Sequence, residues 1–325
     1  MSHFLTVPIN ENGVILDDKI NSILSQAMNR PFDFSDVFIY SHGWWTNATR
    51  AMEDYNRFSI EFARMVGTLA SNAPPVLSNL PASSLGIGIH WPSMLSEDEN
   101  SIANFGQALS FYTMEKRADT VGEHGVYSVL RLALKDRAAD SPPLRIHWLG
   151  HSFGCKVICS ALQEFLDDKA TVQIPKDVTL NVVLLQAATD DNDLESGDVY
   201  GGLADGLPGL RVLVTRSDED KALQTWYPRA HLVNFFRPHN SRVALGAKGP
   251  TAQVVKQFGG MDQVDVDQGF TTAGLAGLTN RLLLANLTPL HQASTEPADS
   301  FSGRHSDIFH DEIYNLIAGF LFTLK

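Results

Sequence analysis

The chain has only two cysteines, Cys155 and Cys159, among its 325 residues. Two cysteines cannot build the network of disulfides that holds a small secreted protein together. They stand four residues apart in a stretch typical of a helix, so we expect two free thiols on one buried face. No group of cysteines and histidines has the spacing of a zinc site. The sequence therefore predicts neither a disulfide scaffold nor a metal centre.

Long apolar runs and basic runs are missing as well. No stretch approaches the roughly 18 apolar residues of a transmembrane helix, and no basic region followed by an apolar segment and a cleavage site opens the chain. These absences predict a cytoplasmic protein without a transmembrane segment. The formal net charge is -12, and Lys and Arg form no run. Because such a surface repels phosphates, we expect no nucleic acid partner.

Apolar residues are plentiful, at 44% of the sequence, which is enough for a large core. Strand-like stretches, rich in apolar and β-branched residues, cover 36–41, 85–91, 144–149, 178–186, 211–215 and 261–266. Helix-like stretches, with apolar residues three and four apart, cover 48–69, 102–137 with a break near Gly122 and Gly125, 153–166, 221–226 and 308–324. This alternation predicts an α/β fold, a mostly parallel sheet covered by helices on both faces.

No change of composition marks a boundary between domains, so the prediction is a single domain over residues 1–325. Two stretches rich in Gly, Pro and Ser, 189–209 and 238–304, have no clear period. Long irregular loops inside compact domains are usually functional, and we expect these two to be lid or insertion segments over the active site. Residues 282–287, within the second stretch, fit either an apolar lid segment or a buried helix.

A candidate nucleophile stands where a predicted strand meets a predicted helix, in Gly150-His151-Ser152-Phe153-Gly154. This is the G-x-S-x-G pattern of the turn that presents the serine of α/β-hydrolases. Such a sharp turn needs small residues two before and two after the serine, so that neighbouring chains can pass. The start of the helix behind the serine favours developing negative charge. Ser152 is therefore the predicted nucleophile.

Other motifs stand in a fixed order around this one: Ile39-Tyr40-Ser41-His42-Gly43-Trp44-Trp45, His90-Trp91-Pro92-Ser93, Ser217-Asp218-Glu219-Asp220-Lys221-Ala222-Leu223 and His305-Ser306-Asp307. Together with the serine motif they resemble an α/β-hydrolase family of unassigned function. Its members combine an H-G-aromatic loop with W-P-S, G-H-S-x-G, an S-x-x-D-x-A-L segment and a late H-S. The resemblance covers residues 36–325, and it implies an α/β-hydrolase fold and a Ser-Asp-His triad but no substrate.

The acid of such a triad is expected on a loop after a late strand, where it can orient the histidine and stabilise its cationic form. Asp220 matches the aspartate of the S-x-x-D-x-A-L segment. Asp218 lies closer to the end of the strand, and Asp190 and Asp191 follow the preceding strand, so these three remain alternatives. An aspartate here that is not catalytic is expected to begin or cap a helix.

The base is predicted to be His305, which follows a Gly-containing loop and precedes the closing helix, where this fold carries its catalytic histidine. His310, inside the predicted helix, and His291, in a Pro-flanked loop, are the alternatives. His151 is expected to support the serine turn. His147 alternates within a strand and is expected to be a packed core histidine.

Acyl transfer also needs two N–H donors for the negative charge on the carbonyl oxygen. One is expected from Phe153, the residue after the nucleophile. The second is expected from the loop His42-Gly43-Trp44-Trp45, and we assign it to Trp44 because Gly43 lets the loop approach closely. His42 is then expected to be structural.

These residues predict a serine hydrolase that cleaves carboxylic esters of small molecules or lipids through an acyl-enzyme on Ser152. The route needs no cofactor and no metal. A lipase or phospholipase and an amidase share the same triad, and the fold does not decide between them. A non-catalytic scaffold on this fold is the alternative from another class. We would expect such a scaffold to have lost a triad member, whereas candidates for all three are present in order.

Overall fold

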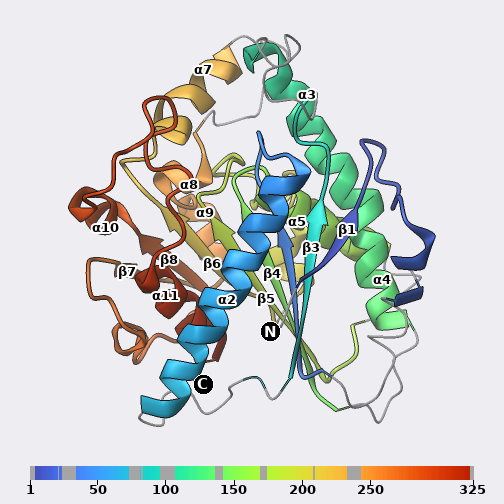
Figure 1. Ribbon diagram of the computed structural model, residues 1–325, viewed down its shortest axis with the longest axis horizontal. Helices are drawn as coiled ribbons and strands as arrows, with labels where there is room; N and C mark the ends of the chain where they lie inside the picture. The colour runs from blue at the N-terminus through green and yellow to red at the C-terminus, as the bar shows by residue number, and fades with distance from the viewer. Residues whose placement is uncertain are drawn as a thin grey trace.

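One eight-stranded sheet forms the centre of the computed structural model, which describes residues 4–20, 22–23, 34–72, 81, 83–95, 107–135, 142–168, 174–207, 209–232 and 243–322 (Figure 1). The strands are β1 (Phe4–Pro8), β2 (Asp36–Ser41), β3 (Ser84–His90), β4 (Leu144–His151), β5 (Val178–Leu185), β6 (Arg211–Arg216), β7 (Met261–Asp265) and β8 (Leu282–Asn286). Their order is β1-β3-β2-β4-β5-β6-β8-β7, and every neighbouring pair is parallel. The predicted parallel sheet is therefore confirmed.

Helices follow most of the strands. The longer ones are α2 (Ala48–Asn72), α3 (Gln107–Thr120), α4 (Tyr127–Lys135), α5 (Gly154–Asp167) and α11 (Asp311–Phe322). The shorter ones are α6 (Gly202–Gly206), α7 (Tyr227–Leu232), α8 (Leu245–Lys248), α9 (Ala252–Gln257) and α10 (Thr288–Ala293). Two π-helical segments, η3 (Val121–Val126) and η4 (Ala222–Trp226), and the 3-10 helix η5 (Thr272–Leu275) complete the described elements.

Two hydrophobic cores lie on opposite faces of the sheet, because successive side chains of a strand point to opposite faces. In β2, Val37 and Ile39 pack into a core shared with α3, η3, α4 and α5. Phe38 and Tyr40 pack into the other core, shared with α2 and α11. Figure 1 shows α2 in front of the strands. Helices thus cover both faces of the sheet, and the predicted α/β architecture, a mostly parallel sheet between two layers of helices, is confirmed.

Two strands differ from the sequence prediction. One of them, β1, is not among the predicted strands; it has five residues, ends at Pro8 and lies at the edge of the sheet. Residues 282–287 form neither a lid segment nor a buried helix, because β8 (Leu282–Asn286) lies between β6 and β7 within the sheet. A short run of leucines fits a buried strand as well as a helix, so periodicity alone cannot separate the two.

The predicted helix break and the two predicted irregular stretches can also be compared with the structure. The predicted break near Gly122 and Gly125 corresponds to η3, which joins α3 to α4. A Cβ on Gly122 would lie 2.4 Å from the backbone oxygen of Val157, so the glycine allows close packing on α5. The stretch 189–209 holds turns and α6, and the described part of 238–304 holds two strands and several short helices. Residues 102–106, 136–137, 208, 238–242 and 323–324 of the predicted segments lie outside the described residues.

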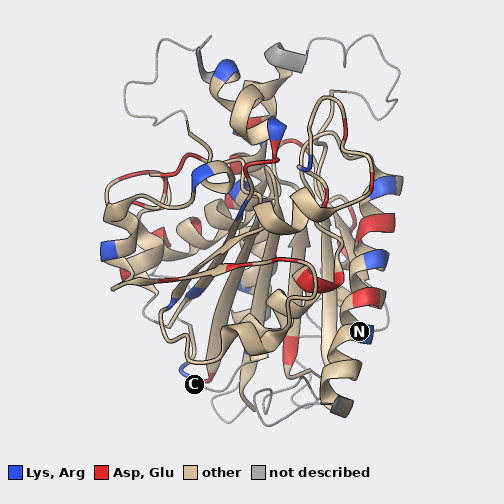
Figure 2. Ribbon diagram, turned by 90° about the vertical axis from the view of Figure 1, so that its left-hand side faces the viewer, with Lys and Arg blue, Asp and Glu red and all other residues tan. Residues whose placement is uncertain are grey.

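The described helices and the distribution of charge bear on the predicted absence of a membrane span and of a nucleic acid partner. Among the helices that the structure describes, none is both long enough and apolar enough to cross a bilayer. In the ribbon of Figure 2, basic and acidic residues alternate along α2, and residues of both charges occur in the loops of that face. The basic groups seen there are accompanied by acidic neighbours.

The parallel arrangement brings the candidate residues to one edge of the sheet. All strands point the same way, so their carboxyl ends meet at a single edge. Ser152 follows β4, Asp220 follows β6, and His305 follows β8 and α10. Residues that are 85 and 153 positions apart in the chain can therefore come into contact there.

Candidate active site

Ser152 occupies the sharp turn between β4 and α5. Its φ of 55° lies in the left-handed region, which is unfavourable for a residue with a side chain. The flanking glycines explain how neighbouring chains fit. A Cβ on Gly150 would lie 2.6 Å from the Cα of Cys155, and a Cβ on Gly154 would lie 2.2 Å from the backbone oxygen of Ser41. The predicted need for small residues on both sides of the serine is therefore confirmed.

Ser152, His305 and Asp220 form one continuous chain of hydrogen bonds. The Oγ of Ser152 lies 2.8 Å from the Nε2 of His305, and the Nδ1 of His305 lies 2.7 Å from the Oδ2 of Asp220. Because a carboxylate accepts, the hydrogen-bond network puts the imidazole hydrogen on Nδ1 and leaves Nε2 to accept from the serine hydroxyl. Such an arrangement can take the proton of Ser152 and stabilise the resulting imidazolium.

Asp220 is fully buried and its two carboxylate oxygens have separate partners. Oδ1 accepts from the backbone N–H of Leu223 at 2.9 Å, so Asp220 also supports the start of η4. Oδ2 accepts from the Nε2 of Gln186 at 3.0 Å in addition to its bond with His305. No sequence pattern predicts this role of Gln186, since a glutamine at the end of a strand carries no local signal of such a contact.

The alternative aspartates lie elsewhere. The side chain of Asp218 is 59% exposed and pairs with Arg216 at 3.1 Å. Asp190 is buried and accepts from the hydroxyl of Tyr227 at 3.0 Å; burial, and then the charge of Asp193, raise its pKa to about 7. Asp191 N–H donates to the backbone of residue 243 at 2.9 Å. The imidazole of His305 is bonded to Asp220 and Ser152 and to none of these three.

The alternative histidines have other partners too. His310 lies just before α11, and its Nε2 is 2.6 Å from the Oδ1 of Asp307, a hydrogen bond that raises the pKa of His310. His291 accepts from the hydroxyl of Ser217 at 2.8 Å and donates to the backbone oxygen of Asp307 at 3.0 Å, and burial lowers its pKa. Neither histidine contacts Ser152 through a hydrogen bond.

Three further histidines have structural contacts. His147 is fully buried and donates to Asp36 at 2.8 Å, so it is a packed core histidine as predicted. His42 donates to the backbone oxygen of Gly43 at 2.8 Å and stacks on Trp91 at 5.5 Å. His151 donates to the backbone oxygen of His305 at 2.9 Å. Burial lowers the pKa of both His42 and His151 to about 3.

The loop after β2 packs directly on the serine turn. A Cβ on Gly43 would lie 2.8 Å from the Cβ of Ser152, and the ring of Trp44 lies 5.9 Å from the ring of Phe153. In the described part of the chain, no acceptor takes the backbone N–H of Trp44 or that of Phe153. Two free N–H groups beside a nucleophile can receive negative charge that develops on a carbonyl oxygen.

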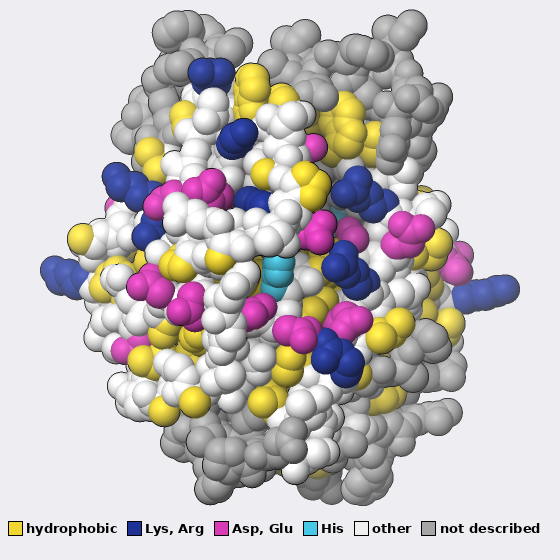
Figure 3. Space-filling model, turned by 60° about the vertical axis from the view of Figure 1, so that its left-hand side comes forward, with side chains coloured by type: hydrophobic (Ala, Val, Ile, Leu, Met, Phe, Trp, Pro, Cys, Tyr) yellow, Lys and Arg dark blue, Asp and Glu magenta, His cyan; other side chains and the backbone are white. Residues whose placement is uncertain are grey.

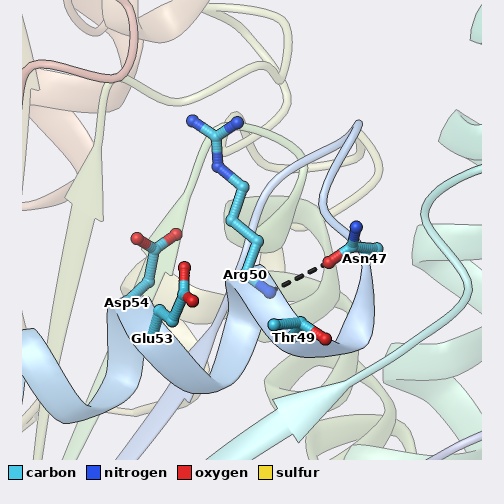
Figure 4. Close-up of a pocket in the computed structure, with 5 residues that line it drawn as sticks. All are labelled: Asn47, Thr49, Arg50, Glu53 and Asp54. Atoms are coloured by element: carbon cyan, nitrogen blue, oxygen red, sulfur yellow. Dashed lines mark hydrogen bonds between the residues drawn. The ribbon is translucent and has the colours of Figure 1, made fainter.

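An open cavity of about 420 Å³ borders the first turns of α2, just after this loop. Asn47, Thr49, Arg50, Glu53 and Asp54 line it, and Figure 4 shows the guanidinium of Arg50 standing clear of the helix. Burial is the main cause of the lowered pKa of His151, and the charges of His305, His42 and Arg50 lower it further. The lining is polar and carries both signs of charge.

Access from solvent is narrow. The side chain of His305 is 12% exposed and Ser152 is 6% exposed. On the face in Figure 3, histidine surface is seen in small gaps between loops, bordered by acidic and basic side chains. Within the described ranges, no three His, Cys, Asp or Glu side chains are grouped so that they could hold a metal ion.

Comparison with known proteins adds one structural likeness. No family model matches the sequence, and no curated protein sequence matches it. Among solved structures, the chain is similar to a dienelactone hydrolase from Anabaena variabilis, with 13% sequence identity, 91% of this chain and 89% of that chain covered, and a TM-score of 0.31. A TM-score of this size transfers neither a substrate nor a residue role. The function therefore has to follow from the geometry of the site itself.

Proposed function

We propose that this protein is a serine hydrolase that cleaves carboxylic esters. Ser152 is the nucleophile, His305 the general base, and Asp220 the acid that orients His305. The observation that carries the proposal is the chain of 2.8 Å and 2.7 Å hydrogen bonds that joins the three side chains. It ends on a serine whose φ of 55° is unfavourable, and unfavourable backbone geometry in folded proteins gathers at functional sites.

The proposed reaction proceeds in two halves. The Oγ of Ser152 attacks the ester carbonyl carbon while the Nε2 of His305 takes the hydroxyl proton. The carbonyl oxygen becomes negative and is met by the N–H groups of Phe153 and Trp44. His305 then gives the proton to the departing alcohol, which leaves an acyl-enzyme. In the second half, His305 takes a proton from water while the water oxygen attacks the acyl carbon. The bond between that carbon and the Oγ of Ser152 then breaks, His305 returns the proton to the Oγ, and the carboxylic acid leaves.

An enzyme explains the site better than a scaffold does. Asp220 is fully buried, and an ionised carboxylate is costly to bury unless hydrogen bonds compensate. Three donors, the N–H of Leu223, the amide of Gln186 and the imidazole of His305, converge on it. A scaffold has no need to maintain this carboxylate, a strained serine and an aligned histidine together.

The substrate we favour is a small ester rather than a long-chain lipid. The apolar segment that could have been a lipase lid is a strand of the sheet, Leu282–Asn286, and so does not support a lipase. The open hollow at the start of α2, which follows the loop that carries Trp44, is lined by polar and charged residues, and such a lining suits a polar group better than an acyl chain. A cytoplasmic location is part of the same proposal. The free, buried thiols of Cys155 and Cys159 agree with a reducing compartment.

Hydrolysis of p-nitrophenyl esters of increasing acyl length tests the proposal. We expect activity to be highest on the short esters and to fall as the chain lengthens. Ser152→Ala should lower the rate by about 10⁶-fold while the circular dichroism spectrum is unchanged. Ser160→Ala is the matched control, since Ser160 lies on α5 and its hydroxyl donates to the backbone oxygen of Asp119 at 3.0 Å. A folded Ser152→Ala protein with wild-type activity would overturn the mechanism.

A further inference from the structure

Gln186 has an unusual backbone for a residue inside the core. It directly follows β5, it is fully buried, and its φ is 45°. The left-handed region is unfavourable for residues with a Cβ, and glutamine has no short side chain to relieve it locally. Its N–H donates to the Oγ1 of Thr215 in β6 at 2.9 Å. The neighbouring strand therefore holds Gln186 in a conformation that the residue does not favour by itself.

The Nε2 atom of the Gln186 side chain donates two hydrogen bonds, each to a different acceptor. Its Nε2 donates to the Oδ2 of Asp220 at 3.0 Å and to the backbone oxygen of Arg304 at 3.0 Å. Both partners can only accept, so the nitrogen and not the oxygen must face them. The Oε1 atom is then left buried without a hydrogen-bond partner among the described residues. An unsatisfied buried acceptor is unfavourable, so stability alone does not explain this residue.

These two bonds join the acid to the segment that carries the base. Asp220 lies after β6, whereas Arg304 is the residue before His305. The Oδ2 of Asp220 is also the oxygen that accepts from the Nδ1 of His305 at 2.7 Å. Gln186 and His305 therefore share one carboxylate oxygen. A second donor on that oxygen lowers its electron density and weakens its hold on a protonated imidazole.

We propose that Gln186 is a positioning residue of the triad, an inference that rests on the proposed function. Its amide fixes the distance between the carboxylate of Asp220 and the backbone next to His305. It also limits how strongly Asp220 favours the protonated imidazole over the neutral one. The unfavourable φ and the unpaired Oε1 are explained by this role, because both follow from aiming the amide nitrogen at two acceptors.

Gln186→Met and Gln186→Leu remove both donors while leaving an unbranched Cβ that the backbone tolerates as it does glutamine. We expect the step in kcat/KM against pH to move upward by about 0.5 to 1 pH unit, which corresponds to the net contribution of one ordinary hydrogen bond. On the plateau kcat should fall by about 10- to 100-fold, since small displacements of catalytic groups have effects of that size. KM should change little.

Tyr127→Phe is the matched control, because it also removes a hydrogen bond to a carboxylate, in this case that of Asp168. Tyr127 lies on α4, which packs against a face of the sheet and not at the edge that carries the triad. Its pH step and its kcat should equal those of the wild type. If folded Gln186→Met and Gln186→Leu variants behave like this control, Gln186 is merely structural and the inference is wrong.

A measurement on the wild type needs neither a variant nor a substrate. In ¹⁵N-labelled protein, the side-chain amide signals of Gln186 should shift with pH through a single midpoint, because one amide hydrogen points at the oxygen that holds the imidazole. Amide signals that do not respond to this titration would contradict the inference. The proposed function fails separately, by a wild type without hydrolysis or by an active Ser152→Ala, and the amide titration is still interpretable in that case.

Discussion

His151 donates its Nε2–H to the backbone oxygen of His305, at 2.9 Å. The donor precedes the proposed nucleophile in the serine turn, and the acceptor belongs to the proposed base. The turn and the base segment are thus joined by a bond that uses neither the hydroxyl of Ser152 nor the imidazole of His305. Burial lowers the pKa of His151 to about 3, so His151 is neutral at physiological pH and its second nitrogen carries no hydrogen.

Buried neutral histidines make stability depend on pH, and His42 offers a clean test. Its pKa is about 3 in the folded protein, against about 6.5 for free histidine. Between these values the unfolded chain binds more protons, so the stabilisation is present above pH 6.5 and is lost as pH falls. The free energy of unfolding of the wild type relative to His42→Gln should decrease by up to about 1.4 kcal/mol per pH unit below pH 6.5. Urea unfolding at several pH values measures this difference.

For Asp190 the free energy of unfolding should change with pH in the opposite direction. Its pKa is raised to about 7, above the usual value of an aspartate, so the folded protein binds more protons below pH 7. The free energy of unfolding of the wild type relative to Asp190→Asn should therefore increase as pH falls from 7 towards 4. If both differences in the free energy of unfolding changed with pH in the same direction, the account of either His42 or Asp190 would be wrong.

The acid assignment is tested by a matched pair of substitutions two residues apart. Asp220→Asn should lower kcat by about 10⁴-fold, because an amide cannot stabilise the cationic imidazole and favours the wrong tautomer. Asp218→Asn loses only the exposed ion pair with Arg216, which is worth less than about 1 kcal/mol, and should retain turnover. Steady-state kinetics of both variants decides the question. An inactive Asp218→Asn beside an active Asp220→Asn would reverse the assignment.

The rate of ester cleavage should rise with pH in a single step near neutrality. A histidine base must be neutral to take the serine proton, and free histidine titrates near pH 6.5. The measurement is kcat/KM for a short p-nitrophenyl ester over about pH 5 to 9, with chemistry shown to be rate-limiting. A flat profile over that range would count against a histidine base.

Gly43→Ala probes the second N–H donor. The added Cβ would lie 2.8 Å from the Cβ of Ser152 and 3.1 Å from the backbone oxygen of His151, so the loop that carries Trp44 must move away. Loss of one oxyanion donor lowers kcat by about 10²- to 10³-fold, and we expect a loss of that size with KM largely unchanged. Gly67→Ala is the control.

Gly67 lies on α2, and a Cβ added to it would have no neighbouring atom within 4 Å. That variant should keep wild-type kcat and should gain up to about 1 kcal/mol in its free energy of unfolding, since alanine is the better helix former. Equal kcat values for both glycine variants would mean that the loop after β2 does not serve the reaction.

Much of the sheet could be predicted from local patterns. The run Asp36–Ser41 is apolar, short and ends before His42-Gly43, and the observed β2 has the same bounds. A strand buried on both faces needs no alternation, so a continuous apolar run suffices. The same property leaves Leu282–Asn286 ambiguous in the sequence, because four of its five residues are apolar and a run this short also fits a buried helix.

Some residues of the candidate site could be predicted from local sequence patterns and others could not. The serine turn has a local pattern because its backbone requires glycines at Gly150 and Gly154. Gln186 has none, because its position depends on a φ of 45° and on partners 34 and 118 residues away in sequence. Side chains that act through such long-range contacts become visible only when the fold has brought them together.

Labelling with a fluorophosphonate probe tests the central claim most directly, because the probe reacts with a serine only where a base has activated it. Intact-mass measurement should show a single adduct on the wild-type protein, and peptide mapping should place it on Ser152. Ser152→Ala should remain unlabelled, and Asp220→Asn should react far more slowly than Asp218→Asn. A folded wild-type protein that takes up no probe, or an adduct that persists in Ser152→Ala, would contradict the account.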